Sequence, residues 1–576
     1  MSPAPADMIR VEQPLLRAVL DNVHALVGHT GILLPSILVV LAVLCLMYPD
    51  RVAFSPPRNR KELAYLPGYP LIGNLIEMMK LDLTKQLEFH LEQFKHSPYG
   101  YQISIPKQGT GSIIMLHRPE YIEYVQKTNF GNYIKGENFR QRFKDFLGST
   151  GIFVADGHAW KTQRKMASHI FSVYQFRTWV QTVVHHELES AISLLDTLTE
   201  RAESKTGGPA TIRLPDLFFR YTLNSFGKMA FAKDIECLTA DPSCLDKEVK
   251  FAAAFDHVQE AINNRFLNPF WPILERVTKE GRRTRRNVAA IREFGLDIVD
   301  ERLKERESGG ASAGTGEKQG SSDEKLQQRK EGKDLLDLFM DLTTDREELL
   351  EVVLNFIIAG RDTTASSLAW LFYELFRHPE YVDQIRNEVR SVLRDESDGS
   401  LKLLPYEQLK DLPFTTAVFN ETIRLHPPVP RNGKTAVKDD VIVPQGPTAA
   451  GLPPIKVYAG EQIGWCDWAI ARCTDVWGPD AAEFRPERFL EVHQDGTKSV
   501  KNYGQWKFHV FNGGPRLCLG MTLATYEALA WVAAVIDRYD FGWATEEQGQ
   551  QAHWPLRYKN SVTHPSEMYT ATVVKR

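Results

Sequence analysis

The segment Phe511-Asn512-Gly513-Gly514-Pro515-Arg516-Leu517-Cys518-Leu519-Gly520 places one cysteine after a glycine-rich stretch and directly before a long apolar run. That run, LGMTLATYEALAWVAAVI, predicts a helix that begins at Cys518. A helix N-terminus offers free N–H groups and a positive dipole end, and both favour the thiolate form of a cysteine. Gly513 and Gly514 permit a tight backbone turn before it. The pattern therefore predicts a thiolate that can bind a metal.

The bulk composition is that of an ordinary folded protein. The 576 residues are 43% hydrophobic and 25% charged, with a formal net charge of −4, which gives no reason to expect nucleic-acid binding. Six cysteines are too few for a disulfide scaffold in so long a chain. No pair among the other five has the short spacing of a zinc site. We expect free thiols in a reducing compartment.

An uncharged stretch near the N-terminus predicts a membrane anchor. Residues 31–48 contain no charged side chain and as a helix would span about 27 Å, close to the thickness of a bilayer core. Two arginines precede this stretch, and four basic residues follow it between positions 51 and 61. The positive-inside rule then makes residues 1–30 lumenal and the rest cytosolic. We expect a single-pass protein of the endoplasmic reticulum membrane.

The remaining chain predicts one large domain. Residues 49–65 are a polar linker, and residues 66–576 form a mainly α domain with small β-sheets. Tyr99–Leu116 is expected to form two strands around a Gly-rich turn, and shorter strands are expected near Asp440–Val443 and at the C-terminus. Residues 307–333 are rich in glycine, serine and charge, which predicts a disordered insertion rather than a domain boundary.

A long helix is predicted from Arg346 to His378. Thr344 and Glu347 have the spacing of a capping box, and Pro379 follows the expected end. The middle of this helix contains the charged and hydroxyl-rich sequence of residues 359–364 between apolar stretches. Such a polar break is costly in a core, which indicates a functional reason for it.

The ten-residue segment around Cys518 resembles the heme loop of the cytochrome P450 family. The resemblance covers residues 66–570 and implies the P450 fold, with heme b as the cofactor and Cys518 as the axial ligand of its iron. It also implies that Arg516 neutralises a heme propionate. Further cofactor contacts are implied for Phe511, Gly514 and Gly520.

The same resemblance gives roles to the polar break in the long helix. In the family this helix crosses over the heme. Ala359 and Gly360 are expected to leave room for bound oxygen. Thr363 matches the residue that hydrogen-bonds activated oxygen, and Asp362 matches the acid that relays protons.

Three further motifs occur in the order typical of the family. Trp160 and Arg164 match its W-x-x-x-R motif, which binds a propionate, and Lys434 falls where many relatives place a basic propionate partner. The Glu-x-x-Arg and Pro-Glu-Arg-Phe motifs are expected to form a buried structural triad. The triad residues are Glu421, Arg424 and Arg488.

The implied reaction is monooxygenation of a hydrophobic substrate by O2 with electrons from NADPH. The chain contains no flavin or nicotinamide domain, so a separate NADPH–cytochrome P450 reductase is expected, with cytochrome b5 as a further candidate partner. Several stretches, among them 129–136 and 147–160, resemble the fatty-acid ω-hydroxylase branch of fungi and plants. Terminal hydroxylation of a long-chain fatty acid or alkane is therefore the expected activity. Oxidation of a sterol, terpenoid or xenobiotic is the alternative, and a heme-based electron carrier or sensor is the alternative from another class.

Overall fold

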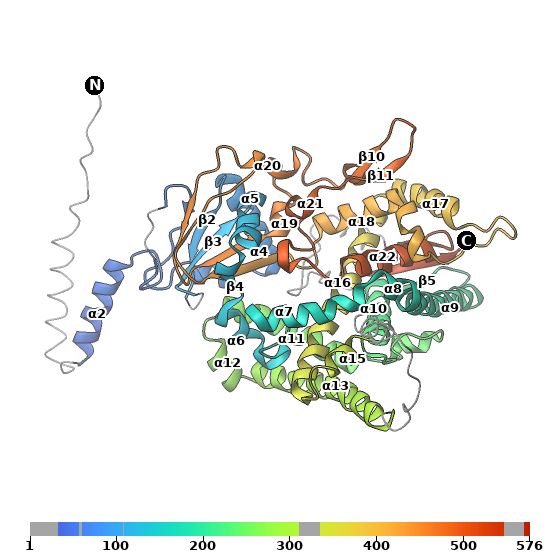
Figure 1. The fold of residues 1–576 in the computed structure, drawn as a ribbon, viewed down its shortest axis with the longest axis horizontal. Helices are drawn as coiled ribbons and strands as arrows, with labels where there is room; N and C mark the ends of the chain where they lie inside the picture. Colours follow the sequence, from blue (N-terminus) through green and yellow to red (C-terminus); the bar gives the residue numbers. More distant parts are fainter. Residues whose placement is uncertain (1–32, 57–59, 107–108, 310–333, 546–568) are drawn as a thin grey trace, which may run out of the picture.

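Helices dominate the part of the chain that the structure describes, and the strands of that part form four small sheets (Figure 1). The computed structural model describes residues 33–56, 60–106, 109–309, 334–545 and 569–576. The α-helices are α2 (Leu33–Met47), α3 (Leu75–Met79), α4 (Leu83–His96), α5 (Pro119–Glu123), α6 (Gly136–Leu147), α7 (Gly157–Ala167), α8 (Val173–Gln175), α9 (Gln181–Thr206), α10 (Leu214–Phe231), α11 (Lys250–Leu267), α12 (Trp271–Val277), α13 (Lys279–Gly309), α15 (Leu335–Met340), α16 (Arg346–Arg377), α17 (Pro379–Leu393), α18 (Pro413–Leu425), α19 (Asp467–Ile470), α20 (Thr474–Trp477), α21 (Gly504–Lys507) and α22 (Met521–Val535). The predicted mainly α class is confirmed.

The largest sheet has six strands in the order β1-β2-β3-β9-β6-β4. Its strands are β1 (Ala64–Tyr65), β2 (Tyr101–Ser104), β3 (Ser112–Leu116), β4 (Tyr133–Ile134), β6 (Arg431–Ala436) and β9 (Gln462–Cys466). The antiparallel pairing of β2 with β3 confirms the two strands predicted in Tyr99–Leu116. The smaller sheets consist of β5 (Ala210–Arg213), β12 (Tyr539–Trp543) and β13 (Thr570–Lys575), of β7 (Asp440–Ile442) and β8 (Ile455–Val457), and of β10 (Leu490–Val492) and β11 (Lys498–Val500).

The folded body begins before residue 66. Strand β1 pairs with β2, and Arg60 is buried where its guanidinium contacts the carboxylate of Glu461 and the amide of Gln102. The end of the predicted 49–65 linker is therefore part of the body, because these polar side chains find buried partners there.

Helix α16 runs for 32 residues, about 48 Å at helical rise, through the interior of the molecule. Its first turn is capped by Asp345, whose side chain accepts hydrogen bonds from the N–H groups of Glu347 and Glu348, both at 2.9 Å. The predicted cap at Thr344 is therefore wrong by one residue. The helix is continuous through residues 359–364, so the polar sequence there does not interrupt it.

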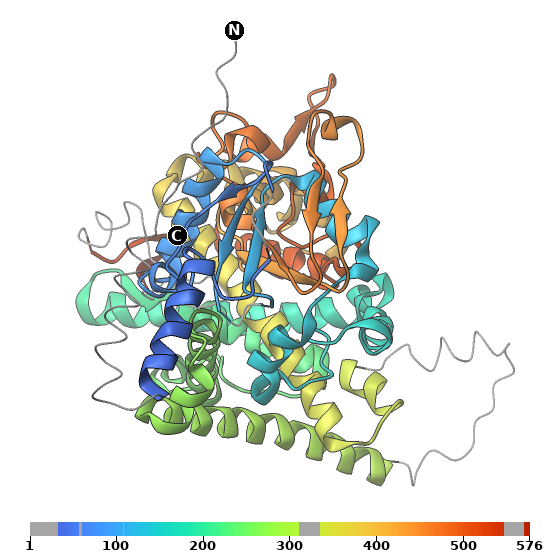
Figure 2. The same cartoon turned by 90° about the vertical axis from the view of Figure 1, so that its left-hand side faces the viewer.

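Helix α10 makes the most extensive helix contact with α16, and α13, α18 and α22 also pack against α16. A Cβ atom at Gly360 would lie 2.0 Å from the ring of Phe226 in α10, so only glycine permits this separation of the two helices. Figure 2 shows α13 along the lower edge of the body, on the opposite side from the strands.

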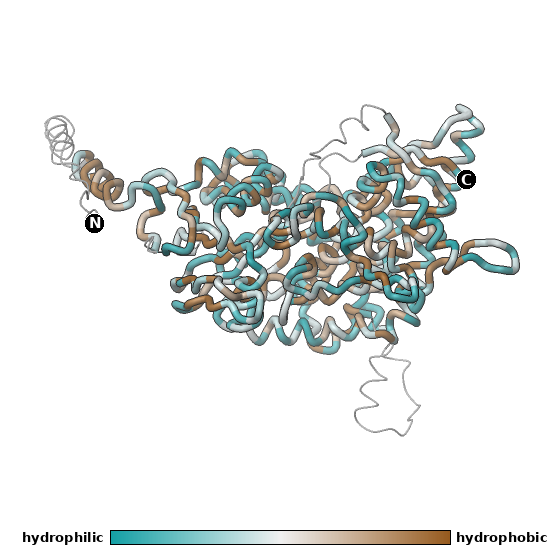
Figure 3. The backbone as a smooth tube through the Cα atoms, turned by 90° about the horizontal axis from the view of Figure 1, so that it is seen from above, coloured by the Kyte–Doolittle hydropathy of each residue, from teal (hydrophilic) through white to brown (hydrophobic). Residues whose placement is uncertain are grey.

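The apolar helix α2 projects from one end of the molecule (Figure 1), and most of its backbone is coloured as hydrophobic in Figure 3. Within the described ranges, no helix is both long enough and apolar enough to cross a bilayer. Residues 1–32 lie outside those ranges, and the anchor over 31–48 stays a prediction. Helix α13 continues to Gly309, so the first residues of the predicted 307–333 insertion are helical, and its remainder, 310–333, also lies outside the described residues.

Candidate active site

The segment before Cys518 folds back on itself. The Cys518 N–H donates to the carbonyl oxygen of Phe511 at 2.8 Å. Gly514 has φ +61°, and a Cβ atom there would lie 2.7 Å from the carbonyl oxygen of Gln126. A Cβ atom at Gly513 would lie 2.4 Å from the ring of Trp506. The turn thus requires glycine at both positions, as the sequence indicated.

Cys518 lies three residues before α22, which begins at Met521 with Gly520 as its N-cap. The predicted position at the helix start is therefore wrong, because Leu519 and Gly520 complete the turn before the helix begins. The N–H of Gly520 still faces the sulfur and favours the thiolate. A Cβ atom at Gly520 would meet Phe171 at 3.8 Å, an ordinary contact, so packing within the chain does not require glycine here.

The thiol of Cys518 stays accessible although protein surrounds it. Its side chain is accessible to solvent, whereas the other four cysteines of the folded body are buried. Burial by the surrounding protein nevertheless raises the pKa of the Cys518 thiol, opposed by the N–H of Gly520 and the charge of Arg164. The two observations are consistent when the sulfur lies within the protein but borders a cavity.

Arg516, Trp160 and Arg164 lie together beside this cysteine. The Arg516 guanidinium donates to the carbonyl oxygen of Ala155 at 2.7 Å and to the Asp156 carboxylate at 3.0 Å. Its central carbon lies 4.3 Å from the centre of the Trp160 ring, and that of Arg164 lies 5.8 Å from it. Burial lowers the pKa of Arg516 to about 10. The Arg516 Nε is buried without a hydrogen-bond partner.

Two lysines complete a cationic cluster, which we define as Lys135, Lys434 and Arg516. Lys434 Nζ is buried and has no hydrogen-bond partner among the described residues. Burial lowers the pKa of Lys434 well below its usual value, and the charges of Lys135 and Arg516 lower it further. The pKa of Lys135 falls to about 8, first by burial and then through Arg516. The carboxylate of Asp156 is the anion that opposes these shifts.

The cationic cluster and Cys518 together fit heme b. Lys135, Lys434 and Arg516 share the carboxylate of Asp156, and the two propionates of a heme would supply further negative charge beside them. Among the described residues no group of three or more His, Cys, Asp or Glu side chains could hold a metal ion. An iron bound by Cys518 alone needs a macrocycle to fill its other positions, and heme supplies one.

The loop of residues 148–156 connects this region to α16. The Glu351 carboxylate on α16 accepts hydrogen bonds from the N–H groups of Ser149 and Thr150 at 3.1 and 2.8 Å. Further along the loop, the carbonyl oxygen of Ala155 accepts from Arg516. The loop therefore holds α16 close to the segment that contains Cys518.

The predicted oxygen-binding residues divide between two faces of α16. Ala359 and Thr363 are half-buried and lie one turn apart, and the Thr363 hydroxyl donates to the Ala359 carbonyl oxygen at 2.7 Å. Gly360 is buried and its Cα faces Phe226 of α10. Gly360 permits the packing of α16 against α10, whereas Ala359 and Thr363 share the accessible face, and the role of Gly360 toward bound oxygen stays a prediction.

Asp362 is buried in a network that joins α16 to α11. Its carboxylate accepts from Arg361 at 2.7 Å and from the Gln259 side chain at 2.5 Å. Arg361 also contacts Asp256, whose side chain is one-third exposed, at 3.0 Å. Burial raises the pKa of Asp362 to about 6, although Arg361 opposes this. A carboxyl group with that pKa can release and regain a proton near neutral pH.

Glu421, Arg424 and Arg488 form a closed ionic cluster, which we call the triad. Both oxygens of Glu421 accept from Arg424, at 2.6 and 2.8 Å, and Arg488 lies 3.5 Å away. Arg424 also donates to the carbonyl oxygen of Ala481 at 2.8 Å, and Arg488 pairs with Asp480. All three members are buried. The triad leaves no charge uncompensated.

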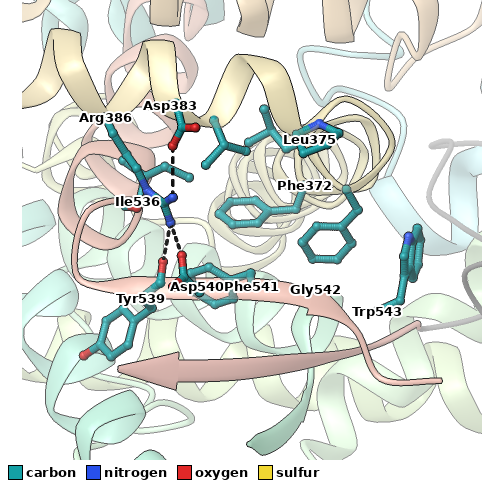
Figure 4. A pocket seen from close by; sticks show the side chains of 13 residues that line it. Phe372, Leu375, Asp383, Arg386, Ile536, Tyr539, Asp540, Phe541, Gly542 and Trp543 are labelled. Carbon is teal, nitrogen blue, oxygen red and sulfur yellow. Dashed lines mark hydrogen bonds and ion pairs between the residues drawn. The ribbon is translucent and has the colours of Figure 1, made fainter. Parts of the chain in front are cut away.

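Sequence reasoning did not identify Lys135, Asp156, Asp256 or Gln259. Each is a single polar residue outside a recognisable motif, and only the fold brings it to the site. A separate surface pocket of about 270 Å³ lies between α16, α17 and β12, where Arg386 contacts Asp383 and Asp540 (Figure 4). None of the residues predicted for the site lines this pocket, so it is not the catalytic cavity.

Comparison with known proteins gives one consistent family. The sequence model described as "Cytochrome P450" matches residues 64–569. "Cytochrome P450 monooxygenase cyp1" of Mycosarcoma maydis is 35% identical over 515 residues, which are 88% of this chain and 74% of the relative. "Cytochrome P450 94A2" of Vicia sativa is 33% identical over 84% of this chain and 87% of its own length. "Cytochrome P450 94B3" of Arabidopsis thaliana is 31% identical, with 82% and 86% covered.

Proposed function

This chain belongs to the cytochrome P450 family, and from that premise we propose that it hydroxylates the terminal carbon of a long-chain fatty acid or alkane. As a member it is a heme-binding monooxygenase that acts on a hydrophobic substrate with O2 and a redox partner. One oxygen atom enters a C–H bond and the other leaves as water. The balance requires two electrons and two protons.

The observation that carries this proposal is the accessible Cys518 thiol beside a buried and undercompensated cationic cluster. Heme, when bound, supplies the redox chemistry that activates O2. Cys518 would hold its iron, and Lys434, Lys135 and Arg516 would pair with its propionates. Asp362 can donate a proton and then regain one from the side of Asp256, the most exposed member of its network. The Thr363 hydroxyl donates to Ala359 and keeps its oxygen lone pairs available to accept a hydrogen bond.

The fatty-acid substrate is supported by the resemblance of several stretches to the ω-hydroxylase branch. One of them, Leu217–Leu223, lies in α10, and its Thr222 hydroxyl donates to the Arg361 carbonyl oxygen at 2.9 Å. The resemblance of this chain to the ω-hydroxylase branch therefore includes α10, a helix that supports the site, and is not limited to the heme-binding motifs.

The cellular setting is part of the same proposal. The uncharged stretch 31–48 and its basic flank support a single-pass anchor in the endoplasmic reticulum membrane, with the catalytic domain in the cytosol. NADPH–cytochrome P450 reductase would deliver the electrons, with cytochrome b5 as a further candidate.

The ligand assignment is tested by the absorption spectrum of the reduced protein under carbon monoxide. Thiolate ligation gives a strongly red-shifted Soret band, which Cys518→Ser should abolish and Cys466→Ser should leave in place. A folded, heme-loaded protein without that band would contradict the assignment. The substrate is tested by turnover with reductase and NADPH, with palmitic acid in one assay and a sterol in another. Oxidation of the sterol without hydroxylation of palmitic acid would contradict the fatty-acid proposal.

A further inference from the structure

Arg431 is a half-buried cation whose side-chain hydrogen-bond partners are neutral. It is the first residue of β6, and its guanidinium donates to the amide oxygen of Gln86 at 2.5 Å and to that of Asn263 at 3.0 Å. Gln86 lies on α4 and Asn263 on α11, and both are buried. Three elements thus fix the orientation of one guanidinium without supplying a negative charge.

The titratable groups that face Arg431 are His90, Tyr101 and Cys466, and all three are neutral at pH 7. Burial, together with the charge of Arg431, lowers the pKa of His90 to about 3. Burial raises the pKa of Cys466 to about 12 and raises that of Tyr101 as well. Within the described chain, no carboxylate forms an ion pair with Arg431.

Three fully buried arginines of the protein pair with carboxylates. Arg265 pairs with Asp145 and Glu275, Arg361 with Asp256 and Asp362, and Arg424 with Glu421. Arg431 has no such carboxylate among the described residues, so an anion from outside the chain would fill that role.

Arg431 is half-buried, so part of its side chain stays accessible, and burial lowers the pKa of its guanidinium. Asn263, its partner on α11, lies one helical turn from Gln259, which contacts Asp362. Residues i and i+4 share a helix face, so one face of α11 spans the distance between Asp362 and Arg431.

We propose that Arg431 binds the carboxylate of the substrate and so fixes which end of an acidic lipid faces the site. This inference rests on the proposed fatty-acid function. A guanidinium has five N–H donors, and the two amide oxygens occupy two of them, which leaves donors for a carboxylate in paired geometry. Gln86 and Asn263 hold the guanidinium in place while the rest of the substrate lies along apolar surface.

The test compares ligands that differ only in charge. The heme-loaded full chain is titrated with palmitic acid, its methyl ester and hexadecane, and binding is followed by the change in the heme absorption spectrum. We expect the acid to bind more tightly than the ester. Arg431→Met should weaken binding of the acid about ten- to a hundredfold and change binding of the ester less than about threefold. Arg431→Lys should recover part of the loss, and Lys456→Met, which removes an exposed lysine of β8, should have no effect.

Equal binding of acid and ester by the natural chain, or equal loss of both in Arg431→Met, would overturn the carboxylate assignment. The carbon monoxide spectrum of each variant shows whether it has folded around heme. Turnover separates this failure from that of the proposed function. When the binding test fails but palmitic acid and hexadecane are still hydroxylated, the carboxylate role of Arg431 is wrong and the proposed function stands. When neither compound is hydroxylated, the proposed substrate class is wrong.

Discussion

The triad and the cationic cluster are built from the same kinds of residue but differ in charge balance. In the triad, the carboxylates of Glu421 and Asp480 and several backbone carbonyl groups pair with Arg424 and Arg488. In the cationic cluster, Lys434 Nζ has no hydrogen-bond partner among the described residues, and Asp156 is the one carboxylate that acts on Lys434 and Lys135. A compensated buried cluster holds the fold together, whereas an undercompensated one indicates a ligand that supplies the missing charge. Variants in the triad should therefore lower the stability of the fold, whereas variants in the cationic cluster should lower heme affinity.

The largest expected effect comes from breaking the triad. Glu421→Gln leaves two buried guanidiniums without their shared carboxylate, and we expect the free energy of unfolding to fall by about 3–5 kcal/mol. Denaturant unfolding followed by far-UV circular dichroism measures this. Glu491→Gln, on the exposed strand β10, is the matched control and should change stability little. A stable Glu421→Gln protein would show that the triad is not a structural cluster.

Glu527 differs from Glu421 of the triad because it is a buried acid with no cation beside it among the described residues. Its carboxyl accepts from Ser225 at 2.7 Å, and burial raises its pKa from 4.5 to about 8. The folded state thus binds this proton more tightly than the unfolded state, so its contribution to stability is present below pH 4.5 and lost as pH rises to 8. At about 1.4 kcal/mol per pKa unit, the loss is a few kcal/mol.

Glu527→Gln should therefore lose less stability than the natural chain when pH rises from 5 to 8. Denaturant unfolding at several pH values in that interval measures the difference. Parallel stability curves for the two proteins would contradict this expectation and would mean that Glu527 is ionised in the folded state.

Lys434→Met should act on the cofactor rather than on the fold. It removes a buried cation that lacks a partner, so we expect the heme-free protein to be no less stable than the natural chain. Heme affinity should fall about ten- to a hundredfold, the value of a charge-assisted hydrogen bond. Heme transfer to an acceptor protein measures the affinity, and Lys438→Met, which changes an exposed lysine, is the control. A loss of stability in the heme-free form would mean that the charge of Lys434 stabilises the fold itself, as the charges of the triad do.

The smallest effect on stability is expected at Thr363. Its hydroxyl donates only to the carbonyl oxygen of Ala359 in the same helix, so Thr363→Val should change the free energy of unfolding by less than about 1 kcal/mol. Product formed per NADPH consumed should nevertheless fall, because the hydroxyl lies on the accessible face of α16. Unchanged coupling of NADPH to product would contradict the predicted hydrogen bond from Thr363 to activated oxygen.

Motif residues could be predicted from the sequence because their chemistry requires a fixed local pattern. The turn at Gly513 and Gly514 and the pairing of Glu421 with Arg424 follow from residue type and spacing. The errors lie at element ends: the cap is Asp345 rather than Thr344, and α22 starts at Met521 rather than at Cys518. Each boundary depends on which nearby side chain or turn satisfies the first N–H groups, and residue spacing alone does not decide this.

Residues that act only through tertiary contacts could not be predicted. Lys135 and Asp156 lie in stretches 129–136 and 147–160, which attracted attention for their resemblance to the ω-hydroxylase branch. The structure places both residues in the cofactor site, so these stretches say less about the substrate than their resemblance suggested. Gly360 is the opposite case: its motif was recognised, but which way its Cα faces depends on α10.

The close contact between Gly360 and Phe226 affects how natural variation at this position should be interpreted. An alanine there adds one methyl group, which would lie 2.0 Å from the ring, so α10 and α16 would have to move apart. Thr363 lies three residues further along α16 and would be displaced with it. A variant at residue 360 that loses activity would therefore report the spacing of two helices, and a compensating smaller residue at position 226 should restore it.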